Sequence, residues 1–394
     1  MRAGLVTWSL VALVAFGPNY PLEAQTGPTN TNQVDVDALI AQMSLADKVG
    51  QLLMFGFPGA DAAKAQPLLT DFRVGGIVLT TNVSSADAAR HLTADLQANA
   101  AAEGLLPLLI SVNHEGGSVQ PIQDGLTVFG SQWDLGQIQP LEVARSAACQ
   151  RGAVMGRELA AIGINTDLAP DIDVLDNSSN TVIGDRAFSG DPSVVAQLGA
   201  AFIEGLQDQG VLAVGKHFPG HGSTTTDSHY TLPVVFHDRG WLDSHELVPF
   251  RAAIQANVAA IMVAHLRFPM IDPEPRPSSL SPVFVTDILR TDLAYNGLVM
   301  TDDLGAMKAV TATYTPAQSA VMALAAGTDV LLSVGPVDDE RQMAEAVIQA
   351  VGATISPDRL DASVRRVLVA KAQVGLLARG ATPLTPATRV CTSG

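Results

Sequence analysis

The chain has 394 residues, of which 47% are hydrophobic and only 16% charged, a composition typical of an ordered globular protein with one large domain or two ordinary ones. The formal net charge is −16. Because nucleic acids and anionic membranes are bound through basic surfaces, this charge argues against a nucleic-acid partner and against adhesion to an anionic membrane. It fits a protein that acts on neutral or weakly charged substrates.

The N-terminus has the pattern of an export signal. Arg2 precedes an apolar run over residues 5–16, and the small residue Ala24 offers a cleavage point, so residues 1–24 are predicted to be a signal peptide. The run is short for a bilayer span, which leaves an uncleaved anchor as the alternative. We therefore expect a periplasmic or extracellular protein with no stable membrane insertion after signal removal. Residues 25–34, rich in Thr, Asn, Gly and Pro, are predicted to form a flexible leader.

Apolar runs and helical periodicities then alternate along the chain. Strands are predicted at 54–59 (ending in a turn), 75–80, 106–112, 166–174, 211–214, 260–264, 297–301 and 329–333. Helices are predicted at 36–53, 86–102, 144–162, 192–208, 243–256, 283–293, 317–326, 340–351 and 357–374. This alternation indicates a parallel sheet with right-handed crossovers.

Eight strand–helix units predict a (β/α)8 barrel of the TIM type, a single catalytic domain over residues 35–380 followed by a Thr/Pro-rich tail at 381–394. A doubly wound open sheet is the alternative. The barrel is favoured because polar residues end nearly every strand, and in a barrel these ends converge on one mouth. They are Asn113, His114, Asp171, Asp173, Lys216, His217, His265 and Asp302.

The stretch from 211 to 233, VLAVGKHFPGHGSTTTDSHYTLP, carries the densest chemistry. An apolar strand at 211–214 is followed by a Gly- and Pro-containing segment, which predicts a loop from Gly215 onward. That loop holds three of the eight histidines of the chain. Its candidate functional residues are Lys216, His217, His221, Asp227 and His229.

The spacing of Asp227 and His229 allows the carboxylate to accept a hydrogen bond from one imidazole nitrogen. This would fix the tautomer and raise the pKa of the imidazole, leaving the other nitrogen to donate a proton. The alternative is a hydrogen bond that merely stabilises a turn. His217, His221, Asp227 and His229 are also zinc-ligand types, but their spacing matches no common metal signature, and we predict no metal and no cofactor.

Asp302 follows the apolar strand at 297–301. Because side chains alternate along a strand, only one of Asp302 and Asp303 is expected to face the barrel interior, and the other to cap or pair. We take Asp302 as the functional carboxylate, although a lone carboxylate at a strand end is often structural. Arg186, in the polar loop 180–189, can bind substrate hydroxyls or form a surface ion pair. Glu115 and the two glycines after it predict a tight turn near the mouth.

These stretches together resemble glycoside hydrolase family 3, and within it the β-N-acetylglucosaminidase branch, over residues 36–377. The resemblance rests on KHFPGHG at 216–222 followed by DSH at 227–229, on 165–174 with its Ala169-Pro170, on IGDRAF at 183–188, and on TDDL at 301–304. It implies a retaining double displacement in which Asp302 is the nucleophile. His229 with Asp227 would be the acid/base pair. Lys216, His217 and Arg186 would hold the sugar, with Asp173 supporting the pocket.

Two positions depart from the family pattern. The family usually carries Asp-Gln-Glu-Gly-Gly-Arg after the third strand, whereas this chain has Asn113-His114-Glu115-Gly116-Gly117-Ser118. Asn113 keeps a hydrogen-bond acceptor for a sugar hydroxyl but loses the charge. Ser118 removes a cation from the mouth. Both changes bear on which sugar is bound.

The sequence thus predicts an exported, monomeric exo-β-N-acetylhexosaminidase that removes terminal N-acetylglucosamine from cell-wall (peptidoglycan turnover) or chitin-type oligosaccharides. The alternatives are a β-glucosidase or phosphorylase of the same family, a sugar-binding protein on this scaffold, and a metal-dependent hydrolase. Cys149 and Cys391 either pair, tying the tail to the domain, or remain ordinary thiols. The sequence leaves that choice open.

Overall fold

The computed structural model describes residues 35–80, 83–377 and 391; the predicted signal peptide and leader, and all of the predicted tail except Cys391, lie outside these residues. The chain forms eight short strands: β1 (Leu53–Phe55), β2 (Gly76–Leu79), β3 (Leu109–Val112), β4 (Thr166–Asp167), β5 (Leu212–Phe218), β6 (Ala260–Val263), β7 (Leu298–Thr301) and β8 (Leu331–Ser333). They lie in the order β7-β6-β5-β4-β3-β2-β1-β8, and every pairing is parallel.

The sheet closes on itself between its first and last strands. Met300 and Val330 form a parallel bridge, and the backbone N–H of Thr301 donates to the carbonyl of Val330 at 3.0 Å. The N–H of Leu304 donates likewise to Leu332 at 3.0 Å. The predicted (β/α)8 barrel is therefore confirmed, and the doubly wound open sheet is excluded.

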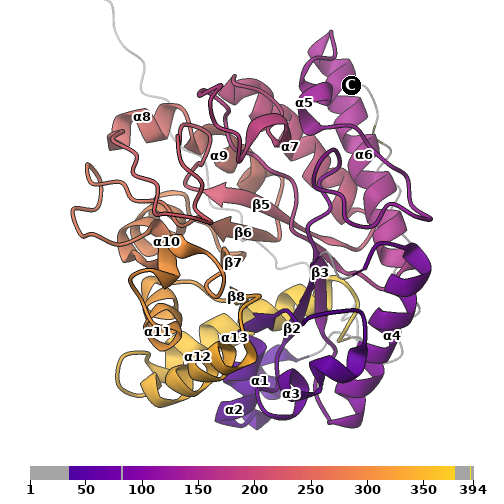
Figure 1. Ribbon diagram of the computed structural model, residues 1–394, viewed down its shortest axis with the longest axis vertical. Helices are drawn as coiled ribbons and strands as arrows, with labels where there is room; N and C mark the ends of the chain where they lie inside the picture. Colours follow the sequence, from indigo (N-terminus) through magenta and orange to yellow (C-terminus); the bar gives the residue numbers. More distant parts are fainter. Residues whose placement is uncertain (1–34, 81–82, 378–390, 392–394) are drawn as a thin grey trace, which may run out of the picture. The chain divides into compact units, whose positions relative to one another are not determined.

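Helices surround the strands, which occupy the centre of Figure 1. In chain order they are α1 (Val36–Gln42), α2 (Leu45–Gln51), η1 (Ala62–Ala65), α3 (Gln66–Thr70), α4 (Ala86–Ala102), α5 (Gln132–Gly136), α6 (Leu141–Ala161), η2 (Gly184–Arg186), α7 (Pro192–Gln207), α8 (Arg239–Ser244), α9 (Leu247–Gln255), η3 (Ser278–Leu280), the π-helix η4 (Val283–Asp292), α10 (Lys308–Thr311), α11 (Pro316–Ala326), α12 (Val337–Ala350) and α13 (Pro357–Gln373). Among the described residues, no helix is both long and apolar enough to cross a membrane.

Several predicted elements differ from the observed ones. The single helix expected at 36–53 is two helices, because Ser44 forms a capping box with Asp47 and starts α2. The helix expected at 243–256 is likewise divided into α8 and α9. The fourth strand is only two residues long, although the segment after it continues to hydrogen-bond with β5 through the carbonyls of Ala169 and Pro170 and the N–H of Ile172.

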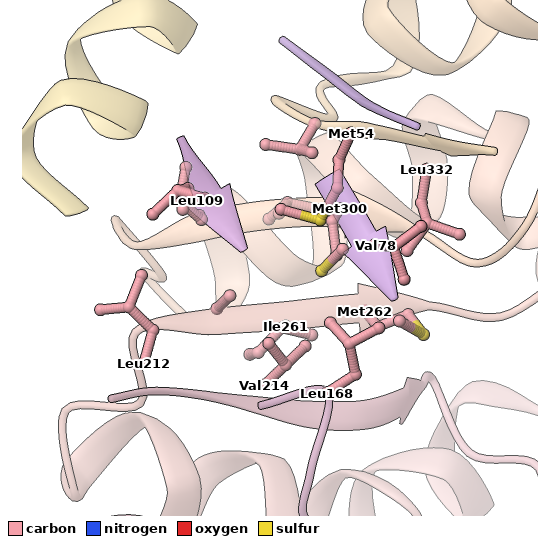
Figure 2. Packing of buried hydrophobic residues seen from close by; sticks show 14 of the residues in the cluster. Met54, Val78, Leu109, Leu168, Leu212, Val214, Ile261, Met262, Met300 and Leu332 are labelled. Carbon is pink, nitrogen blue, oxygen red and sulfur yellow. The ribbon is translucent and has the colours of Figure 1, made fainter. Parts of the chain in front are cut away.

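The barrel interior is filled by apolar side chains that meet from opposite strands (Figure 2). At the C-terminal end of the strands the uppermost layer comes from alternate strands: Val78 of β2, Leu168 just after β4, Met262 of β6 and Leu332 of β8. All four side chains are buried and line the cavity described next. The packed core of the barrel therefore forms the floor of the site.

Candidate active site

A cavity of about 330 Å³ lies at the C-terminal end of the barrel. Above its apolar floor the walls are polar and come from the segments that follow several strands. The polar lining residues are Thr80, Asn113, Glu115, Arg186, Lys216, His217, His221, Ser228, His229, Asp302 and Asp303. The cavity thus combines an apolar base with hydrogen-bonding walls, as small-ligand sites do.

Lys216 and His217 lie within β5, which corrects the prediction that the loop begins at Gly215. The carbonyl of Lys216 accepts from the N–H of Ile172 at 2.7 Å, and its own N–H donates to Pro170 at 3.2 Å. The carbonyl of Phe218 accepts from Ala264 at 2.8 Å. Because both neighbouring segments hold the strand, these polar side chains enter the cavity from a rigid backbone.

A buried ion-pair network forms one wall. The two oxygens of Glu115 accept from Nε and Nη2 of Arg186 at 2.8 and 2.9 Å, and Oε1 lies 2.5 Å from Nζ of Lys216. Nζ of Lys216 also donates to Oδ1 of Asn113 at 2.7 Å. Burial alone would raise the pKa of Glu115, but the charges of Arg186 and Lys216 outweigh it and lower this pKa to about 2. The network presents two fixed cations to a ligand.

Asp173 lies behind His217 and is not among the residues that line the cavity. Its Oδ2 is 2.7 Å from Nδ1 of His217, and its Oδ1 accepts from the N–H of His217 at 3.3 Å and of His221 at 2.6 Å. Burial opposes ionisation of Asp173, but the two histidines outweigh it and lower its pKa. Asp173 therefore orients His217, whose Nε2 lies 3.4 Å from Nη2 of Arg186.

Asp302 follows β7 at the edge of the cavity. Its Oδ1 accepts from the N–H of Asp303 at 2.9 Å. Burial tends to raise the pKa of Asp302, but the fields of His217, His265 and Lys216 and this hydrogen bond lower it overall. The group is thus an ionised carboxylate at neutral pH, as a nucleophile requires.

Asp303 differs from its neighbour. Its Oδ1 accepts from the N–H groups of Gly305, Ala306 and Val334, so this carboxyl organises the loop after β7, the capping role predicted for it. It nevertheless also lines the cavity. Burial raises the pKa of Asp303.

The Asp227–His229 pair forms as its spacing predicts. Oδ1 of Asp227 lies 2.7 Å from Nδ1 of His229 and accepts the N–H of the same residue at 2.8 Å. Burial opposes ionisation of Asp227, but the hydrogen bonds from His229 lower its pKa. The side chain of His229 is 62% exposed and lines the cavity, whereas Asp227 does not line it. The imidazole therefore stands at the rim, supported by the carboxylate behind it.

Among the residues that the structure describes, one group of side chains has metal-ligand geometry. Atoms of Asp171, Asp173 and His217 lie within 4.8 Å of one another. However, Nη2 of Arg186 is 3.4 Å from Oδ2 of Asp171, and Nδ1 of His217 is engaged by Asp173. A guanidinium at this distance would repel a bound cation, so the arrangement is better suited to an ion pair than to a metal.

Two buried residues of the site, Glu115 and Asp171, were not singled out by the sequence prediction as functional. Glu115 was interpreted only as part of a turn and Asp171 only as a polar strand end, whereas His221 was among the candidate functional residues of the loop but was given no role other than that of a possible zinc ligand. Asp171, whose pKa is raised by burial and by the charge of Asp173, contacts Arg186. The only sequence signal for Glu115 and Asp171 was their position near the end of a predicted strand.

Comparison with known proteins places the chain in a family. Residues 44–370 match the model of the glycosyl hydrolase family 3 N-terminal domain. The chain belongs to glycosyl hydrolase family 3. As a family 3 member it is a glycoside hydrolase that acts on O-glycosyl bonds.

Family 3 relatives share much of its length. A β-hexosaminidase of Idiomarina loihiensis is 37% identical over 326 residues, which cover 82% of this chain and 94% of the relative. A Cellulomonas fimi enzyme named β-N-acetylglucosaminidase/β-glucosidase is 34% identical and matches 86% of this chain and 60% of its own. The solved structure of a family 3 β-N-acetylglucosaminidase from a Paenibacillus species superimposes with a TM-score of 0.81 at 41% identity, covering 88% of this chain and 65% of that one.

Proposed function

We propose that this family 3 glycosidase is an exo-acting β-N-acetylhexosaminidase that retains anomeric configuration. The observation that carries the proposal is the pairing of an ionised, buried Asp302 with the supported imidazole of His229 on the wall of one cavity. A retaining glycosidase requires a carboxylate nucleophile and a separate proton donor on either side of the glycosidic bond. Relatives named β-hexosaminidase support the sugar assignment.

The reaction proceeds in two displacements. In the first, a carboxylate oxygen of Asp302 bonds to the anomeric carbon while the glycosidic C–O bond breaks and Nε2–H of His229 protonates the departing oxygen. In the second, the neutral imidazole takes a proton from water, whose oxygen attacks the anomeric carbon and releases Asp302. Asp227 stabilises the imidazolium before the first step and after the second.

The remaining polar wall holds the sugar. Arg186 and Lys216, fixed by Glu115, and the imidazole of His217, fixed by Asp173, offer hydrogen bonds to ring hydroxyls. Because Oδ1 of Asn113 is occupied by Lys216, its amide N–H groups remain to donate to the ligand. A compact cavity of about 330 Å³ with a closed apolar floor supports removal of single terminal residues.

We further propose export and a cell-wall or chitin-type substrate. The apolar run at 5–16 supports export, and so does the disulfide between Cys149 and Cys391, because such bonds persist in oxidising compartments. The two Cα atoms are 5.8 Å apart, a normal spacing for the bond. Polysaccharides of cell walls and chitin are sources of N-acetylglucosamine outside the cytoplasm.

The test is release of nitrophenol from β-N-acetylglucosaminide and β-glucoside substrates. Asp302→Ala and His229→Ala are each expected to lose at least about 10³-fold in kcat, and His91→Ala, an exposed histidine on α4, to match the wild type. Added azide should restore turnover in both variants, giving the α-glycosyl azide with Asp302→Ala and the β-glycosyl azide with His229→Ala. Cleavage of the glucoside alone would contradict the sugar assignment.

Two further outcomes decide between the alternatives. Since a neutral imidazole does not repel phosphate as a carboxylate would, a sugar 1-phosphate formed with inorganic phosphate would indicate phosphorolysis in place of hydrolysis. Sugar binding without turnover under either condition would make the chain a binding protein.

A further inference from the structure

The turn that carries Asp227 and His229 has an exposed side and a buried side. The two acid/base residues are 31% and 62% exposed. Ser228, between them, is only 2% exposed, and its Oγ lies 3.2 Å from Nε2 of the equally buried His221. The inner side of the turn therefore contacts a buried polar group.

His221 is bonded at both ring nitrogens. Nδ1 lies 2.8 Å from Oγ1 of Thr224, and Nε2 lies 3.2 Å from Oγ of Ser228. The hydroxyl of Thr224 donates to the carbonyl of His221 at 3.0 Å, which leaves Oγ1 to accept from Nδ1–H. Nε2 then carries no proton and accepts from the hydroxyl of Ser228. Burial lowers the pKa of His221 to about 4, in keeping with a neutral ring.

Asn180 joins this group to the wall that carries Arg186. Its Nδ2 donates to the carbonyls of His221 and Gly222 at 2.8 and 3.1 Å, and lies 3.2 Å from Oγ1 of Thr224. Its Oδ1 accepts from the N–H groups of 182 and 183, in the loop after β4. The buried side-chain amide of Asn180 therefore connects the segment that supports the acid/base turn to the segment that carries Arg186.

The other side of the turn is fixed by the start of α10. The N–H of Lys308 donates to the carbonyl of His229, and that of Ala309 to the carbonyl of Ser228, both at 3.1 Å. Within the turn, the N–H groups of Tyr230 and Thr231 donate to the carbonyl of Asp227, also at 3.1 Å. The hydroxyl of Ser228 adds the side-chain contact with His221, which holds the turn from its buried side.

We propose that Ser228, anchored on His221, is a positioning residue that sets the direction in which His229 delivers its proton. The inference rests on the proposed function, in which His229 is the acid. Ser228 directly joins Asp227 and His229 along the chain, so a change in its backbone angles moves both members of the pair. An error of about 1 Å in such a group costs on the order of 10²-fold in rate.

The chemistry gives this role a signature. A 2,4-dinitrophenolate leaves without a proton, whereas a 4-methylphenolate or a sugar alkoxide needs one in the transition state. The ratio kcat/KM reports only steps up to cleavage of the glycosidic bond, so the later use of His229 as a base does not enter. Loss of the anchor should therefore slow poor leaving groups and spare the activated one.

The experiment measures kcat/KM for a series of aryl β-N-acetylglucosaminides with Ser228→Ala, with Thr226→Ala, an exposed hydroxyl on the same loop, as the matched control. We expect Ser228→Ala to lose about 10- to 100-fold on the 4-methylphenyl substrate and less than about twofold on the dinitrophenyl substrate. Thr226→Ala should match the wild type on both. An equal loss on both substrates, or none, would overturn the proposal.

The variant His229→Ala distinguishes failure of the positioning role from failure of the proposed function on which that role rests. If His229→Ala shows the strong leaving-group dependence and Ser228→Ala does not, the positioning role fails and the proposed function stands. If His229→Ala shows none, the acid assignment itself fails. In a His221→Phe background, adding Ser228→Ala should cost little more, because the two groups act as one unit; fully additive losses would contradict the anchor. Thermal unfolding of each variant identifies any that is misfolded.

Discussion

At the mouth of the barrel, Glu115 accepts hydrogen bonds from Arg186 and lies against Lys216. Near the opposite end of the strands, Asp329 just before β8 holds an even larger set of cations. Its Oδ2 accepts from Arg290 and from the N–H of Val299, and its Oδ1 accepts from Ser363 and Arg366, with Arg359 at 3.5 Å. Both carboxylates are buried and both are heavily bonded.

The difference lies in what surrounds them. Arg186, in the segment after β4, and Lys216, in β5, both line the cavity, where Nη1 of Arg186 also donates to the carbonyl of Val182 at 3.0 Å. The partners of Asp329 come from η4 and α13, and their remaining bonds go to the backbone: Arg290 to Gly297 at 2.6 Å and Arg359 to Thr328 at 2.6 Å. The network around Glu115 places two cations on the wall of the cavity, whereas the network around Asp329 joins η4 and α13 to the sheet. In a barrel enzyme this is the division between catalysis and stability.

The largest expected effect concerns the network of charged residues around Asp329. Asp329→Asn keeps the shape of the side chain but leaves three guanidinium groups without their counter-charge. Breaking a buried pair in this way costs about 3–5 kcal/mol. Urea denaturation should show that loss, while kcat of the folded variant stays at the wild-type value. A fall in kcat with unchanged stability would reverse the roles assigned to the two ends.

A second test concerns Lys371, a buried lysine of α13 whose Nζ donates to Oε1 of Gln51 at 2.6 Å. Burial lowers the pKa of Lys371 from 10.5 to about 7. The unfolded chain therefore binds more protons between these values, and the free energy of unfolding should rise with pH across this window. We expect about 2–3 kcal/mol of this contribution to appear between pH 6 and pH 9.

Lys371→Met is the matched variant, since it keeps most of the volume and removes the charge. It should be more stable than the wild type at pH 6 and should show a flatter dependence on pH up to 9. Parallel curves for the two proteins would mean that Lys371 stays charged in the fold, contrary to its surroundings.

Much of the fold was predictable, and the reason is physical. Strands of a parallel barrel are buried on both faces, so they appear as short apolar runs, and all eight were found. The fourth strand was predicted too long, and the end of β5 was missed, because Lys216 and His217 break the apolar pattern where they face a polar cavity. A strand whose end lines a polar site no longer consists of apolar residues alone, and an apolar run is the pattern by which buried strands are predicted.

The candidate site was predictable only where partners are close in sequence. The pairing of Asp227 with His229 follows from a two-residue spacing. Glu115 lies 71 residues from Arg186, and Cys149 lies 242 residues from Cys391, so neither contact leaves a local pattern. His221 was visible as a histidine but not as the anchor of Ser228, because that role depends on where the loop folds back.

The smallest expected effect concerns Glu115 at the mouth of the barrel. It measures how strongly Arg186 and Lys216 favour the ionised form of this carboxyl group. The pKa of Glu115 falls from 4.5 to about 2 on folding, so this group stabilises the fold above pH 4.5 and loses that contribution as the pH falls toward 2. About 2 kcal/mol should disappear between pH 5 and pH 3. Glu115→Gln cannot titrate, so its stability should vary less over this interval than that of the wild type, whatever its constant offset. The same variant should also lose activity, because Arg186 and Lys216 would no longer be held by a charge. If the wild type and Glu115→Gln lose stability in parallel, Arg186 and Lys216 do not lower the pKa of Glu115. The cost of burying Glu115 would then be as poorly offset by its neighbours as that of burying Lys371.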